Sequence, residues 1–283
     1  MRPHQDVKIP QNIFINLFVN HLKTASKMRL LAALTFFTRL PFWRLREIPS
    51  GAFKRVVPLW PVAGWLTGGV MALVMWLMLK LTSPMLAWII ALAARLLLTG
   101  ALHEDGLADF IDGFGGGGGS RERTLAIMKD SHIGTYGVLG LIIYYLLMVS
   151  ASASVAPAQL CLLAICGDCW SKCCAAQIIN MLPYARSQEE AKNKTVYSRM
   201  TVWEWVICLA AGVLPAVVII LILGLLPKAF LAAFAAPVIA VLLVAWMCKR
   251  RIGGYTGDCC GAAFILCELA FYLTIAIAFP ALG

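Results

Sequence analysis

The strongest chemical signal in the sequence is a group of four carboxylates, because Glu104, Asp105, Asp109 and Asp112 fall within nine residues. On a helix that turns about 100° per residue, the three aspartates would share an arc of about 60°. Like charges so placed repel one another, and Gly106 weakens a helix further, so the pattern needs a compensating cation. Mg²⁺ prefers carboxylate oxygens and usually leaves coordination positions for substrate phosphates. The segment therefore predicts a Mg²⁺ site for a phosphorylated substrate, with Glu104 as a fourth ligand or as a general base.

The alternative interpretation of these acids is a solvated face of an ordinary surface helix. The residues between them argue against it, since Leu107, Phe110 and Ile111 are apolar and the segment directly follows a long apolar stretch. A helix that is polar along only one narrow arc is typical of the lining of a cleft. The pattern therefore favours the metal site.

A glycine run at 115–119 and a basic segment at 120–134 come next. The glycine run is not a P-loop, because no strand precedes it and no Lys-Ser/Thr pair follows, so we interpret it as a flexible linker. The basic segment opens on Ser120, a typical helix N-cap. Its polar residues could bind phosphate oxygens, although ordinary basic bias of a cytoplasmic loop explains the cations equally well; they are Arg121, Arg123, Lys129 and Ser131.

Other ionisable residues lie near or inside apolar stretches. Asp258 precedes the last such stretch and is interpreted as a ligand or base, whereas Glu268 lies two to three turns inside it. Asp168 and Lys172 are four residues apart and are interpreted as neutralising each other. Asp130, together with Asp258, could bind a second metal or orient a nucleophile. Two histidines are candidates for proton transfer by position alone, namely His103 and His132.

The elements that carry these residues are membrane helices. The chain has 283 residues, of which 61% are hydrophobic and only 13% charged, far from the composition of soluble domains. The fold class is therefore predicted as all-α, a polytopic helical bundle in one transmembrane domain at 28–283, preceded by an extension at 1–27. Residues 28–42 are too short to span and are predicted to lie at the interface or to re-enter. The seven predicted spans are 57–79, 85–102, 135–156, 158–182, 202–226, 229–247 and 259–282.

Basic residues predict the orientation of these spans. Of the 24 Lys and Arg, 20 fall in the segments 1–56, 103–134, 183–201 and 248–258, and only Lys80 and Lys228 fall in the opposite connections. The richer side is therefore predicted to be cytoplasmic, with the active-site loop at about 103–134 on that side and the C-terminus outside. The formal charge of +10 is explained by this topology, so no nucleic-acid partner is predicted. The lipid bilayer is the predicted environment. A homo-oligomer is possible, and the sequence does not give the oligomeric state.

The ten cysteines and the N-terminal extension are given ordinary roles. The cysteines fall in or beside apolar stretches, where Cys behaves as a small hydrophobe, and the single CxxC has no second pair at zinc spacing. Residues 1–27 contain Asp6 and lack the unbroken apolar run of a signal peptide. We interpret them as a dispensable leader, with an interfacial helix as the alternative.

Several of the residues described above belong to motifs through which the chain resembles the cobalamin synthase family, also called the adenosylcobinamide-GDP ribazoletransferases. The resemblance covers the chain from about Met28 to its end. Three features depart from the family pattern: residues 1–27 precede Met28, which resembles the usual family start; Asp168 stands where the family tends to have Arg; and the cysteine content is unusually high. The motifs that carry the resemblance, in order, are FFTRLP at 36–41, GALHEDGLADFIDG at 100–113, IMKDSHIGTYG at 127–137 and GYTGDCCGA at 254–262.

The resemblance implies a Mg²⁺-dependent transferase in a bacterial cytoplasmic (inner) membrane. A ribose hydroxyl of α-ribazole, or of its 5′-phosphate, would attack adenosylcobinamide-GDP and release GMP, giving adenosylcobalamin or its 5′-phosphate. Two alternatives remain at this point. A CDP-alcohol phosphotransferase would need an Ala-Arg pair after Asp-Gly, but Asp109 follows Ala108 here. A cation-coupled transporter would concentrate its acids near the midplane rather than at one edge.

Overall fold

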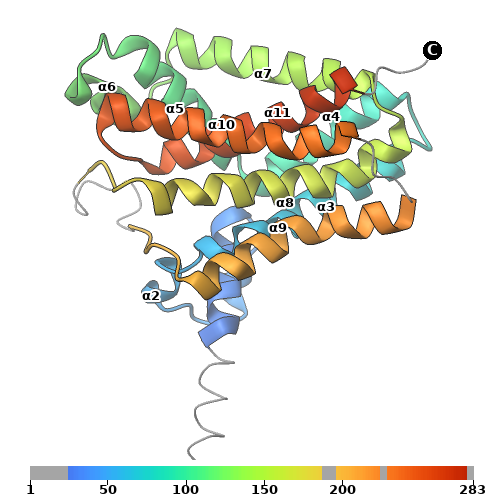
Figure 1. Ribbon diagram of the computed structural model, residues 1–283, viewed down its shortest axis with the longest axis horizontal. Coiled ribbons are helices and arrows are strands. Elements are labelled where there is room, and N and C mark those ends of the chain that lie inside the picture. Colours follow the sequence, from blue (N-terminus) through green and yellow to red (C-terminus); the bar gives the residue numbers. More distant parts are fainter. Residues whose placement is uncertain (1–24, 187–195, 224–227, 279–283) are drawn as a thin grey trace, which may run out of the picture.

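Long apolar runs become helices that lie side by side in one bundle (Figure 1). The computed structural model describes residues 25–186, 196–223 and 228–278, and within these ranges it is all-helical apart from one isolated bridge between Tyr184 and Tyr255. The predicted all-α membrane bundle is therefore confirmed. The long helices are α3 (Trp60–Met78), α4 (Pro84–Thr99), α7 (Thr135–Ala153), α8 (Pro157–Met181), α9 (Val202–Leu223), α10 (Lys228–Ile252) and α11 (Gly257–Ala278).

Shorter helices lie between the long ones. A helix at 25–37 precedes α3 and lies crosswise to the bundle, as an interfacial helix would (Figure 1). It buries Ala32, Ala33 and Phe37, which attaches it to the bundle. The remaining short elements are η1 (Phe42–Arg44), α2 (Ser50–Phe53), η2 (Val57–Leu59), α5 (Leu102–Gly116) and α6 (Arg121–Lys129).

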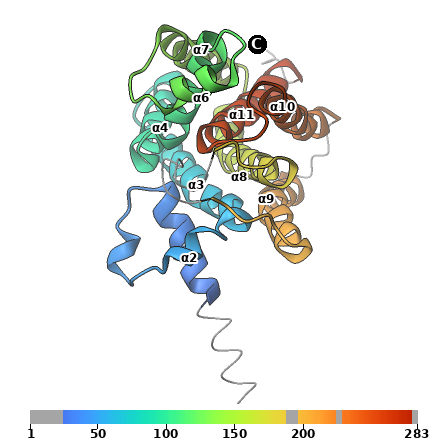
Figure 2. The same ribbon diagram turned by 90° about the vertical axis from the view of Figure 1, so that its left-hand side faces the viewer.

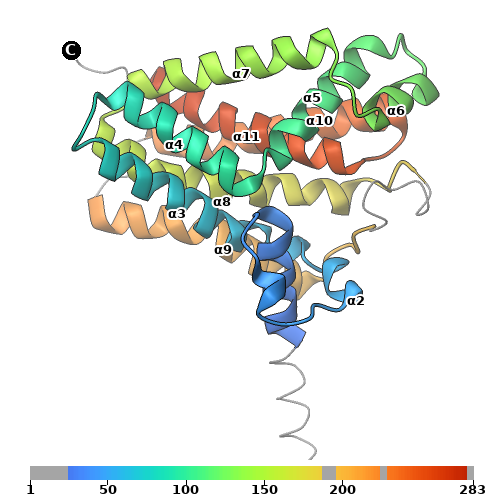
Figure 3. The same cartoon turned by 180° about the vertical axis from the view of Figure 1, so that it is seen from behind.

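Six of the described helices are long and apolar enough to cross a membrane, and the number is seven if the bent pair α4 and α5 is one broken span rather than a re-entrant loop. The second predicted span, 85–102, is therefore right in position but ends early. The chain turns by 89° between α4 and α5 (Figure 3), where Gly100 and Ala101 both have left-handed backbone angles, with φ of 66° and 60°. Left-handed residues end a helix, and glycine adopts this conformation most easily. The bend turns the carboxylate segment across the bundle.

Helix α8 is the central helix. Of the residues in an 18-residue apolar stretch of α8, 78% are buried, compared with 28% for the corresponding stretch of α7. Seen from the end in Figure 2, it lies among α3, α9, α10 and α11, and it contacts all four. The predicted pair Asp168 and Lys172 is confirmed within this helix.

That pair belongs to a larger buried cluster of charges. Arg95 of α4 forms an ion pair with Glu268 of α11 and lies 4.0 Å from Asp168. Tyr144 of α7 joins by hydrogen bonds to both Arg95 and Glu268. These charged side chains are at most 2% exposed. Arg95 pairs with acids of two other helices, whereas Lys172 pairs with Asp168 of its own helix, so each buried charge has an opposite charge beside it.

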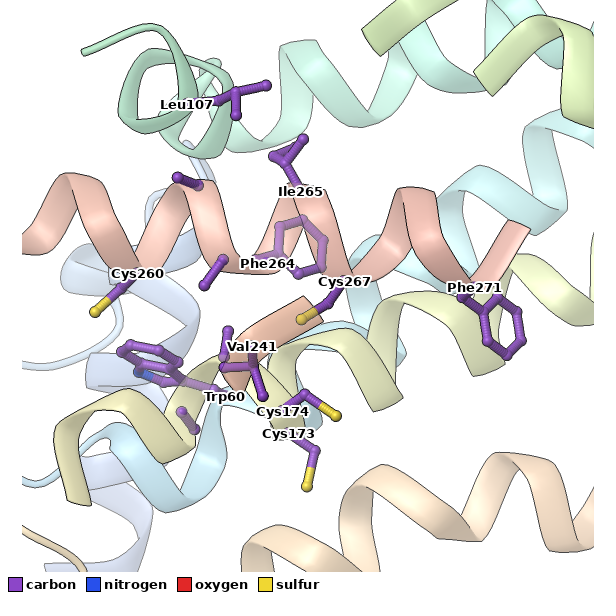
Figure 4. Packing of buried hydrophobic residues seen from close by; sticks show 14 of the residues in the cluster. Trp60, Leu107, Cys173, Cys174, Val241, Cys260, Phe264, Ile265, Cys267 and Phe271 are labelled. Carbon is purple, nitrogen blue, oxygen red and sulfur yellow. The ribbon is translucent and has the colours of Figure 1, made fainter. Parts of the chain in front are cut away.

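The cysteines pack as the sequence predicts. Nine of the ten are buried, and all ten are free thiols. Figure 4 shows Cys173, Cys174, Cys260 and Cys267 among the apolar side chains of the core.

Contacts at one end of the bundle bring together segments that were predicted to share a side. Backbone bonds join Ala185 to Tyr255 and Ser198 to Lys54. Arg121 of α6 donates to the carbonyl oxygens of Ile252 and Ala185, at 3.0 and 2.7 Å. The segments before α3, around α6, after α8 and before α11 therefore meet at the same end.

Candidate active site

The site forms where α5 crosses the start of α11. A methyl group on Gly106 would lie 3.0 Å from the carbonyl oxygen of Asp258 and 3.2 Å from the Cα of Gly261, so the two helices touch through their backbones. This close approach is open only to glycine. It brings Asp105 of α5 and Asp258 of α11 to one cavity, although they are far apart in the sequence.

That cavity, which we call the aromatic cavity, has a volume of about 210 Å³. The acidic and basic side chains on its walls are His103, Asp105, Lys172, Arg186 and Asp258. Its aromatic lining comes from five separate parts of the chain and consists of Phe36, Phe37, Trp60, Tyr184, Tyr197 and Phe264.

The aromatic rings hold one another in place. Trp60 makes edge-to-face contacts with Phe37 and Tyr197, with centroid distances of 5.6 and 5.7 Å. His103 stacks on Phe37 at 5.6 Å and lies 4.3 Å from Phe264. Such pairs stabilise a defined geometry beyond the burial of their area. The cavity is therefore built by side chains that order each other.

The floor of the cavity connects to the buried charge cluster. Lys172 lies with its Nζ 4.0 Å from the ring centroid of Phe264, and the same Nζ donates to Asp168 and to Oγ1 of Thr67. The sequence pattern indicates only a neutralising role for Lys172. Its position adds a cationic wall to the site.

The four carboxylates of the predicted metal site meet different neighbours. Asp105 faces the aromatic cavity, as does Asp258. Asp112 accepts hydrogen bonds from the backbone amides of Gly134 and Gly137, at 2.7 and 2.8 Å, at the start of α7. Asp109 lies between Asp105 and Asp112 on the same face of α5 and is 9% exposed.

Glu104 projects to the interior of the bundle. It is 4% exposed, its Oε2 has no hydrogen-bond partner among the described residues, and it interacts electrostatically with Arg95 and Tyr145. In the described part of the chain, no three His, Cys, Asp or Glu side chains lie close enough together to hold a metal ion. The four-carboxylate Mg²⁺ site therefore stays a prediction. Asp105 and Asp258 fit a hard cation best, since Mg²⁺ is commonly held by one or two carboxylates together with substrate phosphates.

The predicted phosphate-binding residues lie outside the cavity. Ser120 caps α6 as predicted, accepting from the amide of Arg123 at 3.2 Å. Arg121 binds the two carbonyl oxygens described above, so it positions α6. The side chains of Arg123, Lys129, Asp130 and Ser131 are exposed.

Asp130 and His132 form a pair of their own on that exposed segment, with 2.7 Å between Oδ1 and Nδ1. The hydrogen bond from the His132 side chain lowers the pKa of Asp130 below its usual value. The same bond, with the carboxylate charge, raises the pKa of His132. His132 is therefore held in its protonated form to higher pH than a free histidine.

Several residues of the site could not be found from the acid pattern. Trp60, Tyr184, Tyr197 and Arg186 come from connections and helix ends with no chemical motif. Arg186 donates to the carbonyl oxygen of Leu125 at 2.9 Å, which places its cationic head at the cavity wall. Burial raises the pKa of the Tyr184 and Tyr197 hydroxyls, so both stay protonated and able to donate.

Comparisons with known proteins agree with one another. The family model described as cobalamin-5-phosphate synthase matches residues 29–276. An adenosylcobinamide-GDP ribazoletransferase of Shewanella pealeana is 36% identical to this chain, over 87% of this chain and 93% of that protein. Proteins of the same name from Leptothrix cholodnii and Shewanella amazonensis are 37% and 38% identical, over 85% and 87% of this chain and 92% and 93% of theirs. No solved structure gives a significant match.

Proposed function

The chain belongs to the cobalamin-5-phosphate synthase family, and from that premise we propose that it is a membrane transferase which joins adenosylcobinamide-GDP to α-ribazole or its 5′-phosphate. The observation that carries the proposal at the level of residues is the meeting of Asp105 and Asp258 at a cavity that also has cationic walls. Carboxylates can accept a proton or hold a cation, and the guanidinium of Arg186 can neutralise phosphate charge. No observation favours a CDP-alcohol phosphotransferase or a transporter.

In the proposed reaction, a ribose hydroxyl oxygen forms a bond to the phosphorus on the cobinamide side of the diphosphate. The bond from that phosphorus to the bridging oxygen breaks, and GMP leaves with that oxygen. The hydroxyl proton passes to a carboxylate at the cavity. Asp105 and Asp258 both face the cavity, and Oδ2 of Asp258 accepts a hydrogen bond from Oγ1 of Thr256 at 3.3 Å. The product is adenosylcobalamin, or its 5′-phosphate when the acceptor is phosphorylated.

We also propose that the transferase uses Mg²⁺. Asp105 and Asp258 would hold the ion from opposite helices, with Asp109 next to them on α5. A bound Mg²⁺ would neutralise charge on the diphosphate, which is the main requirement of phosphoryl transfer. Asp112 would orient α5 against α7, because both of its oxygens accept amide hydrogens there.

The test of the reaction is direct. Purified protein in detergent or liposomes is given adenosylcobinamide-GDP, α-ribazole 5′-phosphate and Mg²⁺, and GMP and the corrinoid product are measured together. We expect both in equal amounts, and neither after the metal is chelated. Release of GMP without a joined product would contradict the transfer, and undiminished turnover without divalent metal would contradict the role of Mg²⁺.

We propose further that the protein lies in the bacterial cytoplasmic membrane with the aromatic cavity facing the cytoplasm. The distribution of 20 against 2 basic residues supports this orientation. Fusions of a periplasm-dependent reporter test it. Such a reporter should be active in the connection at 79–83, between α3 and α4, and inactive in the connection between α8 and α9. The reverse pattern would overturn the orientation.

A further inference from the structure

We propose that the aromatic cavity binds the base of the acceptor nucleoside, a bicyclic aromatic base with an unprotonated ring nitrogen. This inference rests on the proposed function and adds to it the place where one substrate is recognised. Of the rings on its walls, Figure 4 shows Trp60 and Phe264, together with Cys260, which also lines the cavity.

The size of the cavity limits what can enter. Its volume of about 210 Å³ is below the range of about 300–1,000 Å³ that is usual for pockets holding drug-sized ligands. A corrinoid is larger than such ligands, and a complete nucleoside diphosphate is about their size, so both exceed this cavity. One aromatic ring system, with a sugar at the mouth, suits the space.

Two buried ring nitrogens on the walls lack partners. Trp60 and His103 are each 4% exposed, and Trp60 Nε1 and His103 Nε2 have no hydrogen-bond partner among the described residues. Buried polar atoms in folded proteins are nearly always paired, so these two lining atoms have unused capacity to bind a ligand or a water. An indole N–H can only donate, so the partner of Trp60 must be an acceptor. A benzimidazole-type base offers one ring nitrogen with a free lone pair and flat apolar faces for the surrounding rings.

Guanine of the donor substrate is the rival occupant, and the position of the carboxylates argues against it. In the acceptor, the reacting hydroxyl is on the ribose that carries the base. In the donor, a ribose and a phosphate separate guanine from the reacting phosphorus. Since Asp105 and Asp258 lie on the wall of the same cavity, the base inside it should belong to the nucleoside that reacts beside them.

The first experiment changes the ligand and leaves the protein intact. Wild-type protein is given α-ribazole 5′-phosphate or an analogue whose benzimidazole is replaced by indole, which lacks the acceptor nitrogen. We expect kcat/KM to be about tenfold lower for the indole analogue, the typical effect of one neutral hydrogen bond. Equal kcat/KM for the two acceptors would overturn the proposal.

The second experiment removes the donor from the protein. Trp60→Phe keeps an aromatic ring and deletes the N–H, so KM for the acceptor should rise about tenfold and the preference over indole should vanish. KM for adenosylcobinamide-GDP should stay unchanged. Trp65→Phe is the matched control, since Trp65 lies on the same helix but donates to the carbonyl oxygen of Ala211, away from the cavity.

The outcomes separate this inference from the proposed function. If wild-type protein releases no GMP with either acceptor, the proposed function fails. If it turns over and Trp60→Phe instead raises KM for adenosylcobinamide-GDP, or weakens product inhibition by GMP, the cavity holds guanine and only the inference fails. The indole analogue keeps the proposal falsifiable even where Trp60→Phe does not fold, because equal kcat/KM on wild-type protein overturns it.

Discussion

Two aspartates on one face of α5 have different neighbours, and this makes their roles separable. Asp105 faces the aromatic cavity, whereas Asp112 accepts two amide hydrogens at the start of α7. The sequence places both on one arc correctly, because helical periodicity depends only on spacing. It does not indicate which neighbour each side chain meets, since that depends on how α5 packs against α7 and α11.

We therefore predict opposite results from two matched variants. Asp105→Asn should lower turnover by about 100-fold or more without changing thermal unfolding, because a charge at the reacting groups is lost. Asp112→Asn should destabilise the protein by about 1 kcal/mol, because the two backbone N–H groups bond different oxygens and one of these becomes an NH₂ group, which cannot accept. GMP release and unfolding in detergent measure the two effects. A stable but fully inactive Asp112→Asn protein would instead favour a direct role in catalysis.

At the exposed pair, we predict that Asp130→Asn lowers the pKa of His132. The carboxylate is what raises that pKa, so its removal should return the imidazole toward the ordinary value of about 6.5. The titration can be followed by nuclear magnetic resonance of histidine-labelled protein. High salt should produce part of the same shift in the wild type, because the pair is exposed. An unchanged pKa in the variant would show that the pair does not persist in solution.

At the scale of elements, the buried charges tie the helices together. Arg95, Glu268 and Asp168 come from α4, α11 and α8, and each is buried against the others. Breaking a buried pair leaves a charge without compensation, which typically destabilises by about 3–5 kcal/mol, whereas an apolar replacement of both members is often tolerated.

We predict that Arg95→Met is strongly destabilising and that adding Glu268→Met restores much of the loss. The double variant removes both members of the closest pair and leaves Asp168 to its bonds with Lys172 and Thr67. Unfolding of the single and double variants in detergent measures the difference. If the double variant is less stable than Arg95→Met alone, Glu268 is not the main partner of Arg95.

The elements themselves could largely be predicted from the sequence, whereas their breaks could not. Long apolar runs fix the positions of the spans, because lipid leaves few alternatives to a helix. The turn after α4 depends on left-handed Gly100 and Ala101, and the alanine carries no sequence signal for that conformation. The cavity was also beyond prediction, since Trp60, Tyr197 and Phe264 approach each other only through tertiary packing.

At the scale of the whole molecule, the first described helix is joined to the bundle by packing and by an ion pair. The helix at 25–37 is held by Ala32, Ala33 and Phe37, and Arg29 forms an ion pair with Glu204 at 3.1 Å. All of these residues follow Met28. The family match begins at residue 29.

We therefore predict that a chain starting at Met28 inserts and releases GMP at the wild-type rate. Membrane fractions from cells that make the full and the shortened chains, compared at equal protein amounts, provide the measurement. A shortened chain that inserts normally but is inactive would assign a function to residues 1–27.

The brevity of α4 has a consequence for the surrounding lipid. Its 16 residues extend about 24 Å, while a typical hydrocarbon core is about 30 Å thick. The chain turns sideways after α4. A thicker bilayer would therefore place the acids of α5 in its hydrocarbon core, or it would have to thin locally around them. Reconstituted enzyme should accordingly work fastest with short acyl tails and slow down as the tails lengthen. The length of this one helix would then make the rate of the transfer reaction depend on the thickness of the bilayer.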